Sequence, residues 1–179
     1  MTIFMSEDKN GQEQRTAMEI TIQEAYDAIP DVSLLFREYA ASLEIELDYQ
    51  NFAEELAGLP GKYAKPYGSL YLAYVDDIPA GCIAMRQLDE ARAEMKRLYV
   101  RPAYRGLQLG LLLAQRVIRD AELIGCRSLV LDTLSTMNQA KALYRRLGFV
   151  EIEPYYNSPI AGTTFLSLAL SAPPQEPCV

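Results

Sequence analysis

Apolar residues recur along this chain with two periodicities, and the change from one to the other predicts where strands and helices lie. An apolar stretch at residues 18–22 predicts a first strand. Over residues 25–43 the apolar positions return every three or four residues, which is typical of a helix that buries one face, and Pro30 fits near its first turn. A second, shorter helix is expected at 49–57. The Gly- and Pro-rich segment 58–68 then predicts a loop.

Three apolar runs of strand length follow this loop, at residues 69–75, 82–88 and 93–100. Their short connections predict an antiparallel meander. The order then changes, with a helix at 109–124, a buried strand at 128–133 and a helix at 137–147 that ends at Gly148. Segments 149–152 and 163–170 are expected to close the sheet.

Length and composition give the broad class of protein. A chain of 179 residues, half of them apolar, suits one domain, expected at 18–170 between a polar N-terminal tail (1–17) and a flexible C-terminal tail (171–179). No apolar run approaches the roughly 18 residues that a membrane span needs, and the N-terminus lacks the features of a secretion signal. We therefore expect a cytoplasmic protein with no membrane partner.

Residue usage narrows the chemistry. The chain has no histidine, which excludes Ser-His and Cys-His nucleophile schemes, so proton transfer must use carboxylates, tyrosine, lysine, cysteine or water. The three cysteines, Cys82, Cys126 and Cys178, are far apart and lack metal-ligand spacing, so we expect neither disulfides nor a metal site.

Charge is divided unevenly along the chain, although the net charge is -7. Residues 19–60 hold ten acidic side chains and one basic one, whereas residues 92–146 hold eleven basic and four acidic ones. The basic half lacks the aromatic and helical signatures of nucleic-acid binding, so no nucleic-acid partner is expected. A compact polyanionic cofactor suits it better.

The stretch "YVRPAYRGLQLG" (99–110) joins an apolar strand to a helix through a basic, glycine-containing turn. The first N–H groups of a helix lack internal partners and lie at the positive end of its dipole, which favours phosphate oxygens. Gly106 and Gly110 give the backbone freedom, while Arg101 and Arg105 add charge. A diphosphate would suit this turn, but by itself the pattern fits an ordinary turn slightly better.

These residues resemble the cofactor loop of the GCN5-related N-acetyltransferases, with Arg105, Gly106 and Gly110 in register. The segment "AKALYRRLGFVEIEPYY" (140–156) is similar to the family's next helix and strand through Ala140, Leu143, Tyr144, Gly148 and Phe149. The resemblance covers residues 18–170. It implies the α/β acyl-CoA N-acyltransferase fold, a central mixed, mostly antiparallel sheet flanked by helices. It also implies acetyl-CoA as co-substrate.

The resemblance assigns cofactor contacts on both sides of the turn. The diphosphate is expected on the backbone of Arg105, Gly106, Leu107, Gln108, Leu109, Gly110 and Leu111. The pantetheine arm is expected beside Leu98, Tyr99 and Val100, where a splayed strand would offer free N–H and C=O groups. An N–H of Leu98 or Val100 is expected to stabilise the oxyanion. Asn138 and Tyr144 are further cofactor contacts; Gln108 stands where the family usually has a second glycine.

Two catalytic residues are implied by the same resemblance. Tyr144 is expected to protonate the departing thiolate, and its alternative role is a core aromatic side chain. Glu94 is expected to accept the proton of the amine; the alternatives are a water chain and an exposed Glu94 paired with Lys96 or Arg92.

The expected activity is transfer of an acetyl group to a primary amine of a small molecule or peptide by direct attack in a ternary complex. The acceptor site is expected at the first two helices and the loops 58–68 and 154–163, with candidate lining residues Tyr63, Tyr67, Tyr155 and Tyr156. The acidic residues Glu44, Glu46 and Asp48 would favour a cationic amine. The alternatives are a non-catalytic acyl-CoA sensor and a nucleotide- or phosphopeptide-binding protein. A homodimer is a further expectation from the resemblance.

Overall fold

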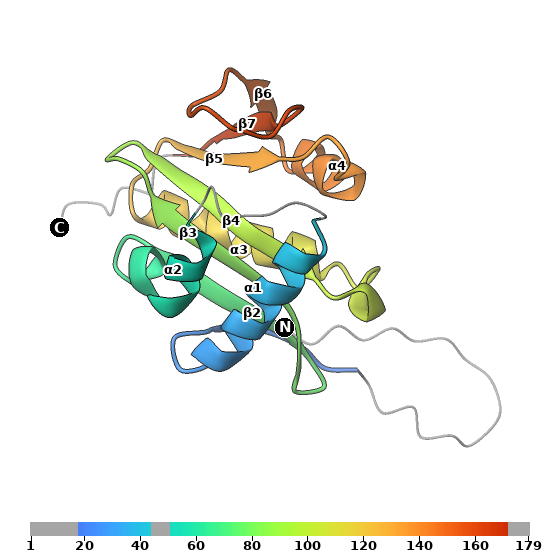
Figure 1. Ribbon diagram of the computed structural model, residues 1–179. Coiled ribbons are helices and arrows are strands. Elements are labelled where there is room, and N and C mark those ends of the chain that lie inside the picture. The colour runs from blue at the N-terminus through green and yellow to red at the C-terminus, as the bar shows by residue number, and fades with distance from the viewer. Residues whose placement is uncertain (1–17, 44–50, 172–179) are drawn as a thin grey trace.

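The computed structural model describes residues 18–43 and 51–171 as one layer of sheet covered on both faces by helices (Figure 1). Its strands are β1 (Ile20–Glu24), β2 (Ser69–Val75), β3 (Ile78–Gln87), β4 (Arg92–Val100), β5 (Ser128–Thr133), β6 (Val150–Ile152) and β7 (Thr164–Ala169). Its α-helices are α1 (Ile29–Ala41), α2 (Phe52–Ala57), α3 (Leu109–Leu123) and α4 (Asn138–Arg146). Short 3₁₀ turns lie at η2 (Gly61–Tyr63) and η3 (Pro102–Tyr104).

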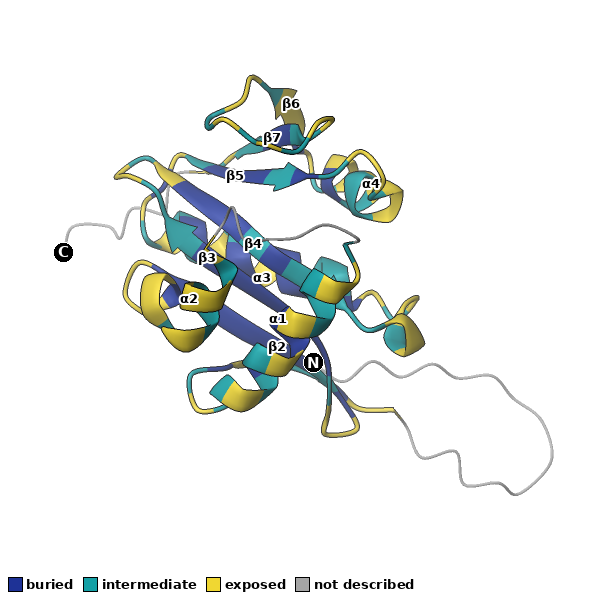
Figure 2. Cartoon of the chain, in the orientation of Figure 1, coloured by how far each residue is buried: buried dark blue, intermediate teal, exposed yellow. Residues whose placement is uncertain are grey.

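The sheet has the strand order β1-β2-β3-β4-β5-β7-β6, and only the β4–β5 pair is parallel. This arrangement confirms the predicted mixed, mostly antiparallel sheet. One face packs against α1 and η2 through a core that includes Phe36, Tyr63 and Leu72. The other face packs against α3 and α4 through a larger core that includes Leu113, Val117 and Tyr144. The buried centre of the sheet and the exposed outer faces of the helices are visible in Figure 2.

Most predicted elements are present, with shifted ends where pairing decides the boundary. The first strand covers residues 20–24 rather than 18–22, because its register pairs Ile20 with Val75 and Glu24 with Tyr71. The β2–β3 turn consists of Asp76 and Asp77, both with positive φ, as in the tight turns that suit the twist of a hairpin. The predicted loop 58–68 contains η2, which buries Tyr63 completely.

Strands β4 and β5 pair over three residues and then diverge. Pairing joins Arg92 to Ser128 and ends at Glu94 and Val130, although β4 continues to Val100 and β5 to Thr133. A bulge in β4 accompanies the divergence: the register against β3 shifts between Cys82 and Ala84, and Arg97 has a φ of 60°. The predicted splayed strand is therefore present and leaves one edge of β4 open.

The remaining expectations concern the cysteines, the membrane and the tails. Cys82 and Cys126 are free and buried. Within the described ranges, the helices are too short or too polar to cross a bilayer, and His, Cys, Asp and Glu side chains form no metal-binding group. The predicted N-terminal tail, nearly all of the C-terminal tail and Cys178 lie outside the described residues.

Candidate active site

A groove of about 1050 Å³ runs between the N-terminus of α3 and the start of α4. This volume is at the upper end of the range for cofactor sites. The groove brings together ten of the predicted cofactor residues: Leu98, Tyr99, Val100, Arg105, Gly106, Gln108, Leu109, Gly110, Leu111 and Asn138. Leu107 packs against the hydrophobic core instead and is not among the lining residues.

The turn before α3 contains five consecutive backbone N–H groups without a partner in the described chain, those of residues 106–110, and all of these residues except Leu107 line the groove. Within the described chain, the N–H of Arg105 donates to Pro102 and that of Leu111 to Gln108, while the five between them make no hydrogen bond. Gly106 has a φ of 88°, a conformation that other residues adopt only with strain. Gln108, just before the helix, also adopts a left-handed conformation. The N–H groups without a partner in the described chain thus cover residues 106–110, a shorter span than the predicted 105–111.

The charge around the turn differs in part from the expectation. Arg105 is exposed and lines the groove. Arg101 does not line it, because its guanidinium forms two hydrogen bonds to Glu38 of α1, at 2.7 and 2.9 Å. Arg146 of α4 lines the groove and was not predicted as a site residue. The turn therefore keeps two basic side chains beside it, one of which comes from a different helix.

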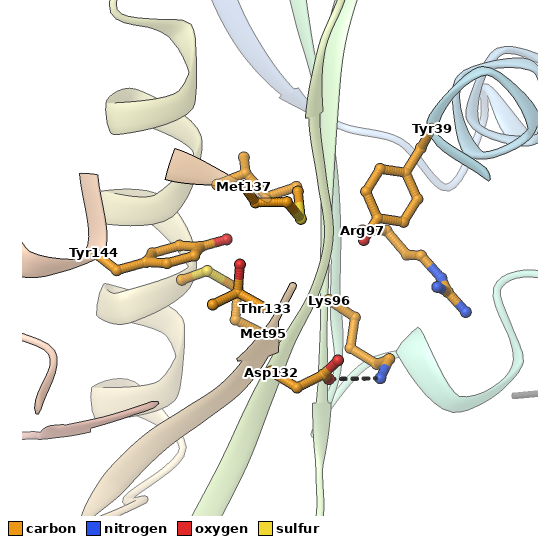
Figure 3. A pocket seen from close by; sticks show the side chains of 9 residues that line it. Tyr39, Met95, Lys96, Arg97, Asp132, Thr133, Met137 and Tyr144 are labelled. Carbon is orange, nitrogen blue, oxygen red and sulfur yellow. Dashed lines mark ion pairs between the residues drawn. The ribbon is translucent and has the colours of Figure 1, made fainter. Parts of the chain in front are cut away.

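A second, smaller pocket of about 30 Å³ occupies the gap where β4 and β5 diverge. Its lining residues are Tyr39, Met95, Lys96, Arg97, Leu98, Asp132, Thr133, Met137 and Tyr144. Figure 3 shows Tyr144 and Thr133 on one side of β4, and Tyr39 and Arg97 on the other. Tyr39, Leu98 and Met137 line both the groove and the small pocket, so the two cavities are neighbours.

Tyr144 has surroundings that suit either of the roles that the sequence left open. It is only 6% exposed, and its ring packs against Phe149 at 5.7 Å between centroids, as a core residue would. It also lines the small pocket, toward which its hydroxyl points in Figure 3. Burial, together with the charges of Tyr39 and Asp132, raises the pKa of Tyr144 above its usual value. The phenol therefore stays protonated at neutral pH, as a proton donor must.

Glu94 lies beside the active-site region, but its side chain is already engaged. It is 1% exposed and accepts hydrogen bonds from Arg86 Nε at 2.6 Å and from the Tyr155 hydroxyl at 2.9 Å. Lys96 Nζ lies 3.5 Å away. Burial favours the neutral acid, yet the charges of Lys96 and Arg86 outweigh it and lower the pKa of Glu94. The expectation of an exposed Glu94 is wrong, and Arg92 pairs with Asp89 instead.

Two adjacent cations, Lys96 and Arg97, line the small pocket and were not predicted. Arg97 forms a bidentate pair with Glu55 of α2, at 2.7 and 3.0 Å, and both side chains are 2% exposed. Lys96 lies 3.5 Å from Asp132. A signal was available in the sequence, because neighbouring strand residues point to opposite faces and two consecutive charges inside an apolar strand therefore place a charge on each face of the sheet. At Arg97 a bulge interrupts the regular alternation of the strand.

The tyrosines considered for the acceptor site have other surroundings. Tyr63 is buried and donates a hydrogen bond to Glu55, Tyr67 is 58% exposed, and Tyr155 donates to Glu94. Neither they nor Tyr156 line the groove or the small pocket. From the loop 154–163, Ile160 and Ala161 line the groove instead. Residues 44–50, which include Glu44, Glu46 and Asp48, lie outside the described ranges.

Comparison with known proteins agrees with this geometry. The sequence matches the acetyltransferase (GNAT) family over residues 31–149. An uncharacterized N-acetyltransferase of Schizosaccharomyces pombe is 40% identical over 145 residues, which cover 80% of this chain and 89% of that protein. The crystal structure of an acetyltransferase from Streptococcus agalactiae has the same fold, with a TM-score of 0.69 at 23% identity over 87% of this chain and 99% of the other.

A second solved structure adds a ligand to the comparison. The PaiA N-acetyltransferase of Thermoplasma acidophilum, solved in complex with coenzyme A, has a TM-score of 0.66 at 16% identity over 84% of this chain and 99% of its own. At this identity the likeness shows the shared fold. The family match covers most of the chain, and the relative in yeast is similar over nearly all of its length. The chain therefore belongs to the acetyltransferase (GNAT) family, and it is an N-acetyltransferase.

Proposed function

We propose that the protein transfers the acetyl group of acetyl-CoA to a primary amine of a small molecule or peptide, by direct attack of the amine in a ternary complex. The observation that carries this proposal is the continuity of the site. A groove of cofactor size begins at five unpartnered N–H groups and adjoins a polar pocket that contains a protonated tyrosine.

The residues of the groove fit coenzyme A. The N–H groups of residues 106–110 would hold the diphosphate, assisted by Arg105 and the dipole of α3. The open edge of β4 at residues 98–100 would bind the amide groups of the pantetheine arm as another strand would. The complex of the Thermoplasma acidophilum enzyme with coenzyme A supports this assignment through the shared fold.

Bound acetyl-CoA supplies an acetyl group activated as a thioester. Around it, an N–H of Leu98 or Val100 would donate to the carbonyl oxygen, where negative charge develops during attack by the amine. Tyr144, protonated and directed into the small pocket, would give its proton to the departing thiolate.

The proton of the attacking amine needs an acceptor. Glu94 is one proposal, supported by its place on β4, but its lowered pKa and its three polar partners make it a weak base. The carboxylate of Asp132, which lines the small pocket, has a longer contact with its cationic partner and is the better candidate.

Two measurements test the proposed function. Thermal shifts should be positive with coenzyme A and acetyl-CoA and absent with ATP; a ligand at 100 times its Kd adds about 2.7 kcal/mol to the free energy of unfolding. Release of free thiol from acetyl-CoA should then appear with at least one member of a panel of amines, amino acids and peptides. Binding without thiol release across the panel would favour a non-catalytic sensor. A shift with ATP alone would contradict the proposal.

A further inference from the structure

The small pocket contains a polar group that nothing in the described chain satisfies. Thr133 is 3% exposed, and its Oγ1 is buried without a hydrogen-bond partner. A buried hydroxyl left without a partner costs free energy, so such groups usually bind a water molecule or a ligand. The pocket it lines has a volume of about 30 Å³, which is enough for a water molecule. The Thr133 side chain points into this pocket (Figure 3).

Asp132, the preceding residue, brings a carboxylate to the same pocket from the other face of β5. Asp132 and Thr133 both line the pocket, although neighbouring strand residues point to opposite faces of β5. The Asp132 side chain is 15% exposed, and its carboxylate lies 3.5 Å from Lys96 Nζ. A water molecule in the pocket would thus lie near both a hydroxyl and a carboxylate.

The charged and titratable groups around Asp132 come from several elements. Lys96 and Arg97 of β4 line the same pocket, and Glu94 shares Lys96 with Asp132. Tyr144 of α4 lines the pocket, and Tyr155, beyond β6, is close enough for its charge to interact with Asp132. Among the three acidic side chains nearest the divergence, Glu55 is occupied by Arg97 and Glu94 by Arg86, whereas Asp132 has only the longer contact with Lys96.

We propose that Asp132 accepts the proton of the acceptor ammonium through a single water molecule held by Thr133 Oγ1 in the small pocket. The ammonium gives one proton to the water while the water gives one to an Asp132 oxygen. The amine becomes neutral and nucleophilic, and Asp132 becomes a carboxylic acid that later returns its proton to solvent. This inference rests on the proposed function, because it needs an amine acceptor, and it replaces Glu94 as the base.

The first test compares D132N with the wild type over a range of pH. The amide keeps the shape of the side chain but cannot accept the proton, so kcat/KM near neutral pH should fall by about 10- to 100-fold. The deficit should shrink as pH rises toward the pKa of the amine, because the acceptor then arrives already neutral. A purely structural defect would not be rescued in this way. D89N makes the same chemical change at an exposed carboxylate outside both cavities and should behave as the wild type.

Substitutions of Thr133 test the water. T133V replaces the hydroxyl that would hold the water by a methyl group of the same shape and leaves no buried polar group without a partner, so its Tm should stay close to that of the wild type. Its kcat/KM should nevertheless fall with the same rescue at high pH, whereas T133S, which keeps the hydroxyl, should retain most activity. The double variant D132N/T133V should lose no more than D132N alone, since both changes break the same relay.

Crystallography gives a readout that does not depend on activity. A high-resolution crystal structure of the wild type should show an ordered water bonded to Thr133 Oγ1 and Asp132, and T133V should lack it. An empty pocket, or a D132N deficit that stays constant with pH, would overturn the inference. E94Q should lower the Tm, and any loss of its activity should not be recovered at high pH. Recovery of activity at high pH would instead indicate that Glu94 is the base. If the wild type transfers no acetyl group, the proposed function fails, and the crystal structure still decides whether the water site exists.

Discussion

The ring of Tyr144 packs against Phe149 while its hydroxyl points into the small pocket. One substitution can therefore separate its packing from its proposed role as a proton donor. Y144F keeps the packing against Phe149 and removes the proton donor. We expect kcat to fall by about 100-fold, in the range of general acid catalysis, with little change in Tm. A rate assay and a thermal melt measure the two effects. A large loss of Tm with unchanged kcat would show that Tyr144 is only a core residue.

The pH dependence of the wild type follows from the same residue. Because burial raises the pKa of Tyr144 above its usual value of about 10, loss of its proton should cause no decline of kcat below about pH 10. An alkaline decline with a midpoint near pH 8 that disappears in Y144F would contradict this assignment.

The buried pair of Glu55 and Arg97 predicts how stability changes in acid. Burial favours the neutral acid, but Arg97 and Lys62 outweigh it and lower the pKa of Glu55 from 4.5 to about 2. A carboxyl with a lowered pKa stabilises the fold above its unfolded pKa, and this contribution is lost as pH falls through its folded pKa. We expect about 3 kcal/mol of stability to disappear between pH 5 and about pH 2.

Denaturant titrations of E55Q and E24Q across this pH range measure that contribution. The free energy of unfolding of E55Q should be about 3–5 kcal/mol lower than that of the wild type at neutral pH, because Arg97 is left buried and unpaired. The stability of this variant should also fall less as the pH decreases. Glu24 pairs with Lys65 at the surface, so E24Q should change the free energy of unfolding by less than about 1 kcal/mol. Equal losses in the two variants would count against a special role for the buried pair.

At the scale of elements, the turn before α3 allows a matched comparison of two glycines. Gly106 precedes the helix with a φ of 88° and Gly125 follows it with a φ of 83°, and a Cβ at either would meet no atom within 4 Å. G106A and G125A should therefore each cost about 1–2 kcal/mol of stability through backbone strain alone. Only G106A should also weaken the binding of coenzyme A, since Gly106 lines the groove and Gly125 does not. Calorimetry with coenzyme A would contradict the assignment if both variants bound alike.

The sequence predicts these elements well where one local rule decides them. Strand β5 has the predicted bounds, and α3 begins at the predicted residue, because an apolar run and a glycine-containing turn mark them without competition. Strand β1 is displaced because pairing with β2, which is distant in the sequence, sets its register. The ten groove residues followed from the family pattern, whereas Arg101 could not be excluded without knowing that Glu38 lies beside it.

The small pocket was less predictable because it depends on tertiary structure. Lys96, Arg97 and Asp132 come from two strands that pair over only three residues, and Arg97, at the bulge of β4, pairs with Glu55 of α2. Glu94 was located correctly on its strand, but its burial depends on Arg86 and Tyr155, which the sequence does not place beside it. In the sequence, the one signal for these residues was the presence of charged side chains inside apolar runs.

At the scale of the whole molecule, the sheet consists of two parts joined at the short β4–β5 pairing. The cofactor groove is lined by both parts, by β4 and α3 on one side and by the start of α4 on the other. Coenzyme A bound there should slow amide hydrogen exchange in β5 and β7 as well as at residues 106–110, because separating the two parts would then also break contacts with the ligand. ATP is the control. Protection confined to the turn would show that the ligand does not bridge the two parts.

The burial of Cys82 and Cys126 has a practical consequence for a colorimetric assay that detects free thiol. Burial raises the pKa of both thiols, so little of the reactive thiolate form is present. An aromatic disulfide dye added to the native enzyme should leave both side chains unlabelled, so that in a C178S variant the absorbance would report product alone. Replacing Cys178 by serine removes the remaining thiol of the chain. Mass spectrometry of the dye-treated C178S variant should then show no added mass until the protein is unfolded.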